Sequence, residues 1–104
     1  MTTYSLEFLR QATSEWRALD SAIRNQIQKK LDKRLRNPHN PADRLTGKLA
    51  GLYRLKFSKS GMRLIYQVKD DRLLVVVVAI GKREDFDVYQ SAVLRLAQLI
   101  DDED

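Results

Sequence analysis

The sequence predicts one α+β domain with the element order β-α-α-β-β-β-α, an antiparallel meander with a helical pair on one face and a C-terminal helix. Apolar residues in the first third recur every three or four positions, which is typical of amphipathic helices. Three runs in the second half have the character of strands joined by short turns. The chain has 104 residues, of which 43% are hydrophobic. That length suffices for one core, so we expect residues 1–104 to form a single domain, with an acidic tail at 101–104.

The N-terminal third predicts a short strand followed by two antiparallel helices. Residues 2–6 alternate in type, as a strand does, and the next apolar residues form a helical stripe of Phe8, Ala12, Trp16 and Leu19. Asp20 or Ser21 can cap the second helix, because a short side-chain oxygen satisfies the free N–H groups of a first turn. The stripe of that helix comprises Ile23, Ile27, Leu31 and Leu35. Pro38 disfavours helical geometry at Asn37, so the second helix should end there.

The second half predicts the meander. Its strand-like runs are GLYRLKFS at 51–58, GMRLIYQVK at 61–69 and RLLVVVVAIG at 72–81. Residues 73–80 are apolar without alternation, which predicts a central strand covered on both faces. A closing helix should follow, with Asp85 or Asp87 near its start and a stripe of Tyr89, Ala92, Val93, Leu96 and Ile100.

Composition excludes several classes of site. The chain has no cysteine, which excludes disulfides, a thiolate nucleophile and cysteine-based metal sites. Its longest apolar run is shorter than the roughly 20 residues that cross a bilayer. The opening MTTYSLEF lacks the regions of a signal peptide. We therefore expect a cytoplasmic protein that does not bind membranes.

The charge balance favours a polyanionic partner. The chain carries 19 lysines and arginines against 14 acidic residues, and four of those acids are the last four residues. The first 100 residues thus hold 19 cations and 10 acids, a net charge of +9. Such a basic domain is a candidate for binding RNA or DNA. The alternative is that its helix surfaces are simply rich in lysine, and charge alone does not reject it.

Strand alternation gathers cations on one sheet face, which we expect to be open to solvent, with the helices on the other face. Arg54 and Lys56 share a face of their strand, and the short SKSG turn brings Arg63 beside them. Arg83 follows the next strand, and the closing helix returns Tyr89 to the same region. The structural alternative is that open sheet faces often carry cations that prevent edge pairing. Convergence with Arg83 and Tyr89 favours a site for a phosphate-bearing ligand.

Other candidates for chemistry are weaker. His39 is the single histidine and lies between two prolines, which suggests a loop residue, while Trp16 belongs to the core. The acids Glu84, Asp85 and Asp87 suit a helix start, where they complement the helix dipole. No set of carboxylates and histidine suggests a metal site. We expect no cofactor and no catalytic metal.

Several stretches together resemble the RelE family of toxins from bacterial toxin–antitoxin systems, and its RelE branch most closely. The similarity runs from about residue 4 to about residue 96 and is carried by EWRAL at 15–19, RNQIQKKL at 24–31, LTGKLAGLYRLKF at 45–57, SGMRLIYQV at 60–68, IGKRE at 80–84 and VYQSAV at 88–93. The resemblance implies a ribosome-dependent endoribonuclease that cuts messenger RNA in the ribosomal A site. It also implies a RelB-like antitoxin as partner, through which the complex would bind operator DNA.

The family's catalytic cluster falls on Arg54, Lys56, Arg63, Arg83 and Tyr89. The cations that we expect to contact RNA or ribosome are Lys29, Lys30, Lys33, Arg34 and Lys82. Two positions depart from the pattern, since Arg54 stands where RelE has a lysine and Thr46 where it has an arginine. Arg54 keeps the positive charge of a lysine but differs in the geometry of its hydrogen bonds and in its acidity. Thr46 removes a positive charge at its position.

The implied reaction is attack of a ribose 2′-OH on the adjacent phosphate, for which Lys56 or Tyr89 could act as base. Two other functions stay open at this point. ParE-type relatives inhibit DNA gyrase by binding alone, and a basic interaction domain without activity is the third possibility.

Overall fold

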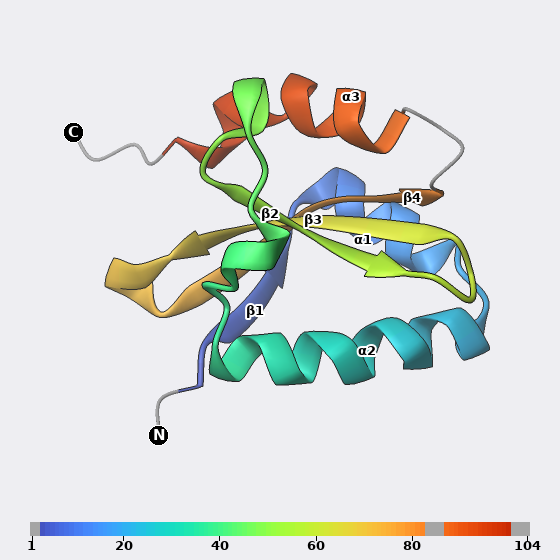
Figure 1. Ribbon diagram of the computed structural model, residues 1–104. Coiled ribbons are helices and arrows are strands. Elements are labelled where there is room, and N and C mark those ends of the chain that lie inside the picture. Colours follow the sequence, from blue (N-terminus) through green and yellow to red (C-terminus); the bar gives the residue numbers. More distant parts are fainter. Residues whose placement is uncertain (1–2, 83–86, 101–104) are drawn as a thin grey trace.

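The computed structural model in Figure 1 describes residues 3–82 and 87–100 and confirms the α+β class. Its helices and strands are β1 (Ser5–Phe8), α1 (Arg10–Arg17), α2 (Ser21–Arg36), β2 (Leu52–Phe57), β3 (Met62–Lys69), β4 (Leu74–Lys82) and α3 (Asp87–Leu94). A short 3₁₀ segment, η4 (Leu96–Leu99), follows α3. No helix in the described part of the chain is long and apolar enough to cross a membrane.

One four-stranded sheet in the order β1-β4-β3-β2 organises the molecule. The pairs β2–β3 and β3–β4 are antiparallel, as the meander predicted, while β1 runs parallel to β4. Helix α2 covers one face of the sheet and α3 the other, below and above it in Figure 1. Residues 74–80 of β4 are all buried, which confirms a central strand covered on both sides.

The two helices of the N-terminal third form for the predicted reasons. The Asp20 carboxylate accepts a hydrogen bond from the Ile23 N–H at 2.9 Å and caps α2, and α2 ends at Arg36, just before Asn37. The first stripe is divided between two elements, because Phe8 is the last residue of β1 and pairs with Val77. Its ring still packs on Trp16, with 5.5 Å between centroids. The apolar contact therefore forms although α1 begins only at Arg10.

The C-terminal end differs from the predicted single helix. After Leu94 the chain tightens into η4, with a hydrogen bond from Gln98 N–H to the Arg95 carbonyl. Leu99 is buried, whereas Ile100, which we placed on the helix, lies beyond η4 and is 75% exposed.

A β-bulge in β4 sets which side chains face α3. The register pairs Ile65 with Ala79 and Tyr66 with Val77, so Val78 has no partner on β3. Both Val78 and Ala79 consequently pack on the α3 side of the sheet.

The same register places Gly81 opposite Arg63. A Cβ at Gly81 would lie 3.0 Å from the Cβ of Val88, so a larger residue there would force α3 away from β4 by a few tenths of an ångström.

Candidate active site

Lys56 and Arg63 are direct cross-strand partners on β2 and β3, and Gly81 of β4 lies next to Arg63. Lys56 is exposed and Arg63 half-buried. Both line a hollow of about 270 Å³ together with Ser58 and Gly61. Two cations that line one hollow give it a positive potential, which favours an anionic ligand.

Arg54 and Tyr89 form the second half of the candidate site. Arg54 lies two residues before Lys56 and therefore on the same face of β2. Its Nη1 donates a hydrogen bond to the Tyr89 Oη at 3.1 Å, which ties β2 to the first turn of α3. Its Nε is shielded from solvent and has no hydrogen-bond partner among the described residues. We refer to Arg54, Lys56, Arg63 and Tyr89 as the basic site.

The face that carries the basic site is open at one end only. Toward Leu52 and Ile65 the face is apolar, and Val88, Ala92 and Leu99 of the C-terminal segment pack on it. The expectation of a sheet face left open to solvent therefore holds only around Lys56. The packing of the C-terminal segment on this face holds α3 in a position from which Tyr89 reaches Arg54.

The basic site lacks an acidic partner among the residues that the structure describes. Within residues 3–82 and 87–100, no carboxylate forms an ion pair with Arg54, Lys56 or Arg63. Like charges on directly opposed strand residues destabilise a sheet, so this arrangement costs stability until an anion arrives. Arg83, which we place in the same cluster, lies outside the described residues.

The predicted RNA-binding cations do not all join the site. Lys29 and Lys33 are exposed on α2, which covers the opposite face of the sheet. Arg34 forms an ion pair with Asp43 at 3.1 Å. Lys82 lies beside Met62, in a groove of about 550 Å³ on the α1–α2 side.

Lys30 comes nearest to the basic site. Its Nζ donates to the Lys56 carbonyl at 2.6 Å and lies 5.2 Å from the centre of the Phe57 ring. Burial lowers the pKa of Lys30, and the positive charges of Arg34 and Lys56 lower it further, although Asp43 opposes them. Lys30 therefore attaches α2 to the outer edge of β2.

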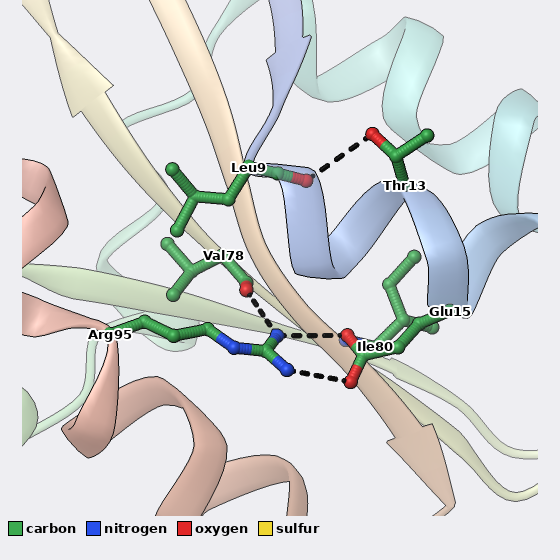
Figure 2. A network of polar contacts seen from close by, with 6 residues as sticks. All are labelled: Leu9, Thr13, Glu15, Val78, Ile80 and Arg95. Atoms are coloured by element: carbon green, nitrogen blue, oxygen red, sulfur yellow. Dashed lines mark hydrogen bonds and ion pairs between the residues drawn. The ribbon is translucent and has the colours of Figure 1, made fainter.

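Two polar networks escaped the sequence prediction. In the first, Glu15 of α1 and Arg95 bind each other and the backbone of β4 (Figure 2). A signal for it was present, since Arg95 occupies a helical stripe position among the buried residues Val88, Ala92 and Leu99.

The second network surrounds His39. Its Nδ1 lies 2.8 Å from the Tyr53 Oη and its Nε2 lies 2.6 Å from Asp70 Oδ1, which also accepts from the Tyr4 Oη at 2.6 Å. His39 is thus a loop residue that joins distant segments. Among the described residues, no group of three or more histidines or carboxylates could hold a metal ion.

Comparison with known proteins agrees with this architecture. A family described as the ParE toxin of the type II toxin–antitoxin system parDE matches residues 6–85. A putative RelE-like toxin protein of Escherichia coli is 46% identical over 93 residues, which cover 89% of this chain and 97% of that protein. The mRNA interferase toxin RelE of E. coli K12 is 43% identical with the same coverage.

Solved structures extend the likeness to three dimensions. A doubly substituted E. coli RelE in the free state superposes with a TM-score of 0.82 at 41% identity, covering 91% of this chain and 99% of that one. A chain of the intact E. coli RelBE toxin–antitoxin complex gives 0.72 at 42% identity, covering 76% and 95%. The fold, the length and the identity over most of the chain agree, and the chain belongs to the RelE/ParE family of type II toxin–antitoxin toxins.

Proposed function

We propose that this protein is the toxin of a type II toxin–antitoxin system and acts as a ribosome-dependent endoribonuclease. Its substrate is messenger RNA in the A site of the 30S ribosomal subunit, and cleavage inhibits translation in the cytoplasm. The observation that carries the proposal is the opposed pair Lys56 and Arg63, free of carboxylates among the described residues, beside the bonded pair Arg54 and Tyr89. The 43% identity to a protein named mRNA interferase toxin RelE supports it.

The proposed reaction is an in-line attack of a ribose 2′-oxygen on the adjacent phosphorus. The 2′-OH loses its proton, the new O–P bond closes a 2′,3′-cyclic phosphate, and the downstream 5′-oxygen leaves with a proton. Such a step needs a base, positive charge around the phosphate and an acid. Lys56 or Tyr89 is the base in this scheme, Arg63 together with Arg83 neutralises the phosphate, and one of the cations of the cluster gives the 5′-oxygen its proton.

The bond from Arg54 gives Tyr89 a defined orientation in this scheme. The phenol oxygen accepts from Arg54 Nη1, and this bond fixes where the oxygen lies for a contact with a ribose or phosphate oxygen. Arg54 keeps further donors for the same phosphate, because a guanidinium carries five N–H groups. Side chains thus supply the charge that a metal ion supplies in other nucleases.

The partner that we propose is a RelB-like antitoxin, since an E. coli RelBE complex is among the similar structures. A basic toxin selects an acidic segment that folds on contact. We propose that it wraps the helical pair and the sheet edge, buries more than roughly 1,600 Å², and displaces α3 with Tyr89. The complex would bind operator DNA through the antitoxin. A co-structure that leaves α3 in place and the basic site open would contradict the displacement.

Inhibition of DNA gyrase by binding is the second candidate, because the matching family carries the ParE description. One experiment separates the two functions. Purified protein is added to programmed ribosomes, message is scored by primer extension, and gyrase supercoiling is assayed in parallel. We expect A-site cleavage and unchanged supercoiling, whereas the reverse pattern would establish the ParE-type function.

The same assay tests the role of metal. Ribosomes are kept assembled while cobalt hexammine replaces magnesium, and cleavage should persist. Loss of cleavage from intact ribosomes would show that a metal ion takes part in the reaction.

A further inference from the structure

The edge of β4 is covered by side chains where its partner strand stops. Strand β1 ends at Phe8, opposite Val77, whereas β4 continues to Lys82. Just beyond that point lies the bulge residue Val78. Its carbonyl accepts from Arg95 Nη1 at 2.8 Å, and the N–H of Ile80 donates to Glu15 Oε1 at 3.1 Å (Figure 2). The Val78 carbonyl and the Ile80 N–H, which a longer β1 could have satisfied, are thus bonded to the side chains of Arg95 and Glu15.

The two side chains also bind each other as a fork. Arg95 Nη1 lies 2.9 Å from Glu15 Oε1, and Arg95 Nη2 lies 3.0 Å from Glu15 Oε2. The side chain of Arg95 is only 13% exposed and that of Glu15 29%, so solvent screens the ion pair weakly. Figure 2 shows Glu15 reaching from α1 and Arg95 from the C-terminal segment, with β4 between them. We call Glu15 and Arg95 the β4 latch.

Helix α3 depends on contacts of this kind. It has only eight residues, and isolated helices of that length are not stable in water. Val88 and Ala92 are buried against the sheet, but Leu94 is 82% exposed. Arg95 follows directly after α3 and bonds to β4 and α1 at once. The latch therefore holds the C-terminal end of the helix whose first turn carries Tyr89.

We propose that Glu15 and Arg95 are positioning residues for RNA cleavage: their fork over the β4 bulge fixes α3 and thereby holds the Tyr89 hydroxyl on Arg54. This inference rests on the proposed nuclease function. Neither side chain touches the substrate, and both act through the orientation of Tyr89. An antitoxin that displaces α3 must break this latch.

A double-mutant cycle tests the latch. Arg95→Met keeps the apolar stem and removes the fork, and Tyr89→Phe removes the hydroxyl that the fork is proposed to position. Misplacement of a reacting group by about 1 Å costs roughly a hundredfold in rate. We expect Arg95→Met alone to slow single-turnover cleavage at saturating ribosomes by roughly that factor, with the half-saturating concentration unchanged. In the Tyr89→Phe background the same change should slow cleavage only about threefold or less, because sites that act as a unit are not additive. Equal slowing in both backgrounds would overturn the proposal, since a general loss of structure affects both alike.

Amide hydrogen exchange supplies a readout that does not need activity. Arg95→Met and Glu15→Gln should speed exchange in α3 while the amides of β3 keep wild-type protection. Glu7→Gln and Arg17→Met change exposed charges on β1 and α1 and serve as matched controls. Unchanged exchange in α3 would overturn the latch itself. If the wild-type protein leaves message intact, the proposed function fails, whereas the exchange comparison still tests the latch.

Discussion

Two groups of polar side chains lie at different places on the same sheet, and they differ in how their polar groups are bonded. Around Asp70, the hydroxyl of Tyr4, the ring of His39 and the hydroxyl of Tyr53 form a continuous chain of hydrogen bonds. In the basic site, Lys56 faces Arg63 across the β2–β3 pair, and no described carboxylate neutralises either one.

The difference separates stability from function. The Asp70 network joins the residue before β1, the loop after α2, strand β2 and the turn after β3, so its bonds link four segments of the fold. The basic site joins cations that repel one another, which no requirement of folding explains. Residues of the first kind should affect melting when they are changed, and residues of the second kind should affect cleavage.

The largest effect should follow removal of a cation from the basic site. We expect Lys56→Ala or Arg63→Ala to slow message cleavage by roughly a hundredfold or more, because each removes a stabilising contact to the anionic transition state. The free energy of unfolding should change by only about 0.5 kcal/mol, and relief of the cross-strand repulsion favours a small gain. Single-turnover cleavage and urea denaturation measure the two quantities. Arg17→Ala, which removes an exposed cation on α1, is the control and should cleave at the wild-type rate. If Lys56→Ala and Arg63→Ala also cleave at the wild-type rate, the cations of the basic site take no part in the reaction.

Tyr89→Phe sharpens the comparison with a smaller change. It keeps the ring and deletes only the hydroxyl that accepts from Arg54. We expect cleavage to fall by roughly a hundredfold or more while the melting temperature and antitoxin affinity hold. Arg83→Ala should behave in the same way. Full cleavage by the double variant Tyr89→Phe/Arg83→Ala would exclude these side chains from the chemistry.

Much of this comparison could be predicted from the sequence, because periodicity reports which side chains share a face. Alternation in β2 and β3 placed Arg54, Lys56 and Arg63 together without knowledge of the strand ends. The sequence also indicated that the closing helix brings Tyr89 to the same region, but not that the C-terminal segment covers the apolar part of that face.

The features that escaped prediction depend on contacts between distant segments. No local pattern reveals that β1 stops at Phe8 and leaves the Val78 carbonyl for Arg95. The bulge at Val78 is likewise invisible in an uninterrupted run of valines. Similarly, His39 finds Asp70 only because the sheet brings two turns 31 residues apart to the same edge.

Tyr66, which stacks on Tyr53 of the Asp70 network, should show an intermediate effect on stability. Its ring is fully buried and its hydroxyl donates to the Pro38 carbonyl at 2.8 Å. We expect Tyr66→Phe to lower the free energy of unfolding by about 1 kcal/mol at neutral pH. The substitution removes the hydrogen bond to the Pro38 carbonyl and leaves that carbonyl without its Tyr66 donor.

Alkaline denaturation tests the same residue independently. Burial raises the pKa of Tyr66, and the negative charge of Asp43 raises it further, against the opposing charge of Arg34. A folded-state pKa above that of the unfolded chain, near 10, means that the stabilisation is complete below pH 10 and is lost as pH rises toward the folded-state value. The wild-type protein should therefore lose stability above pH 10 more steeply than Tyr66→Phe in urea denaturation. Parallel slopes for the two proteins would exclude Tyr66 as the titrating group.

The smallest effect is expected at Asp70, and its size depends on pH. The hydrogen bond from His39 lowers the pKa of Asp70 below its ordinary value of 3.8, and the bond from Tyr4 lowers it further. A lowered folded-state pKa means that the stabilisation is present above the ordinary value and is lost as pH falls through the folded-state value. Asp70→Asn should thus melt slightly below the wild-type protein at pH 7, and the difference should shrink below about pH 4. Asp71→Asn, at the next position of the same turn, is the matched control, and thermal melts from pH 7 to pH 3 follow both variants. Cleavage at pH 7 should be the same for wild type and Asp70→Asn, because this network links segments of the fold and lies outside the basic site. A melting difference that does not change with pH would show that the carboxylate charge contributes nothing there.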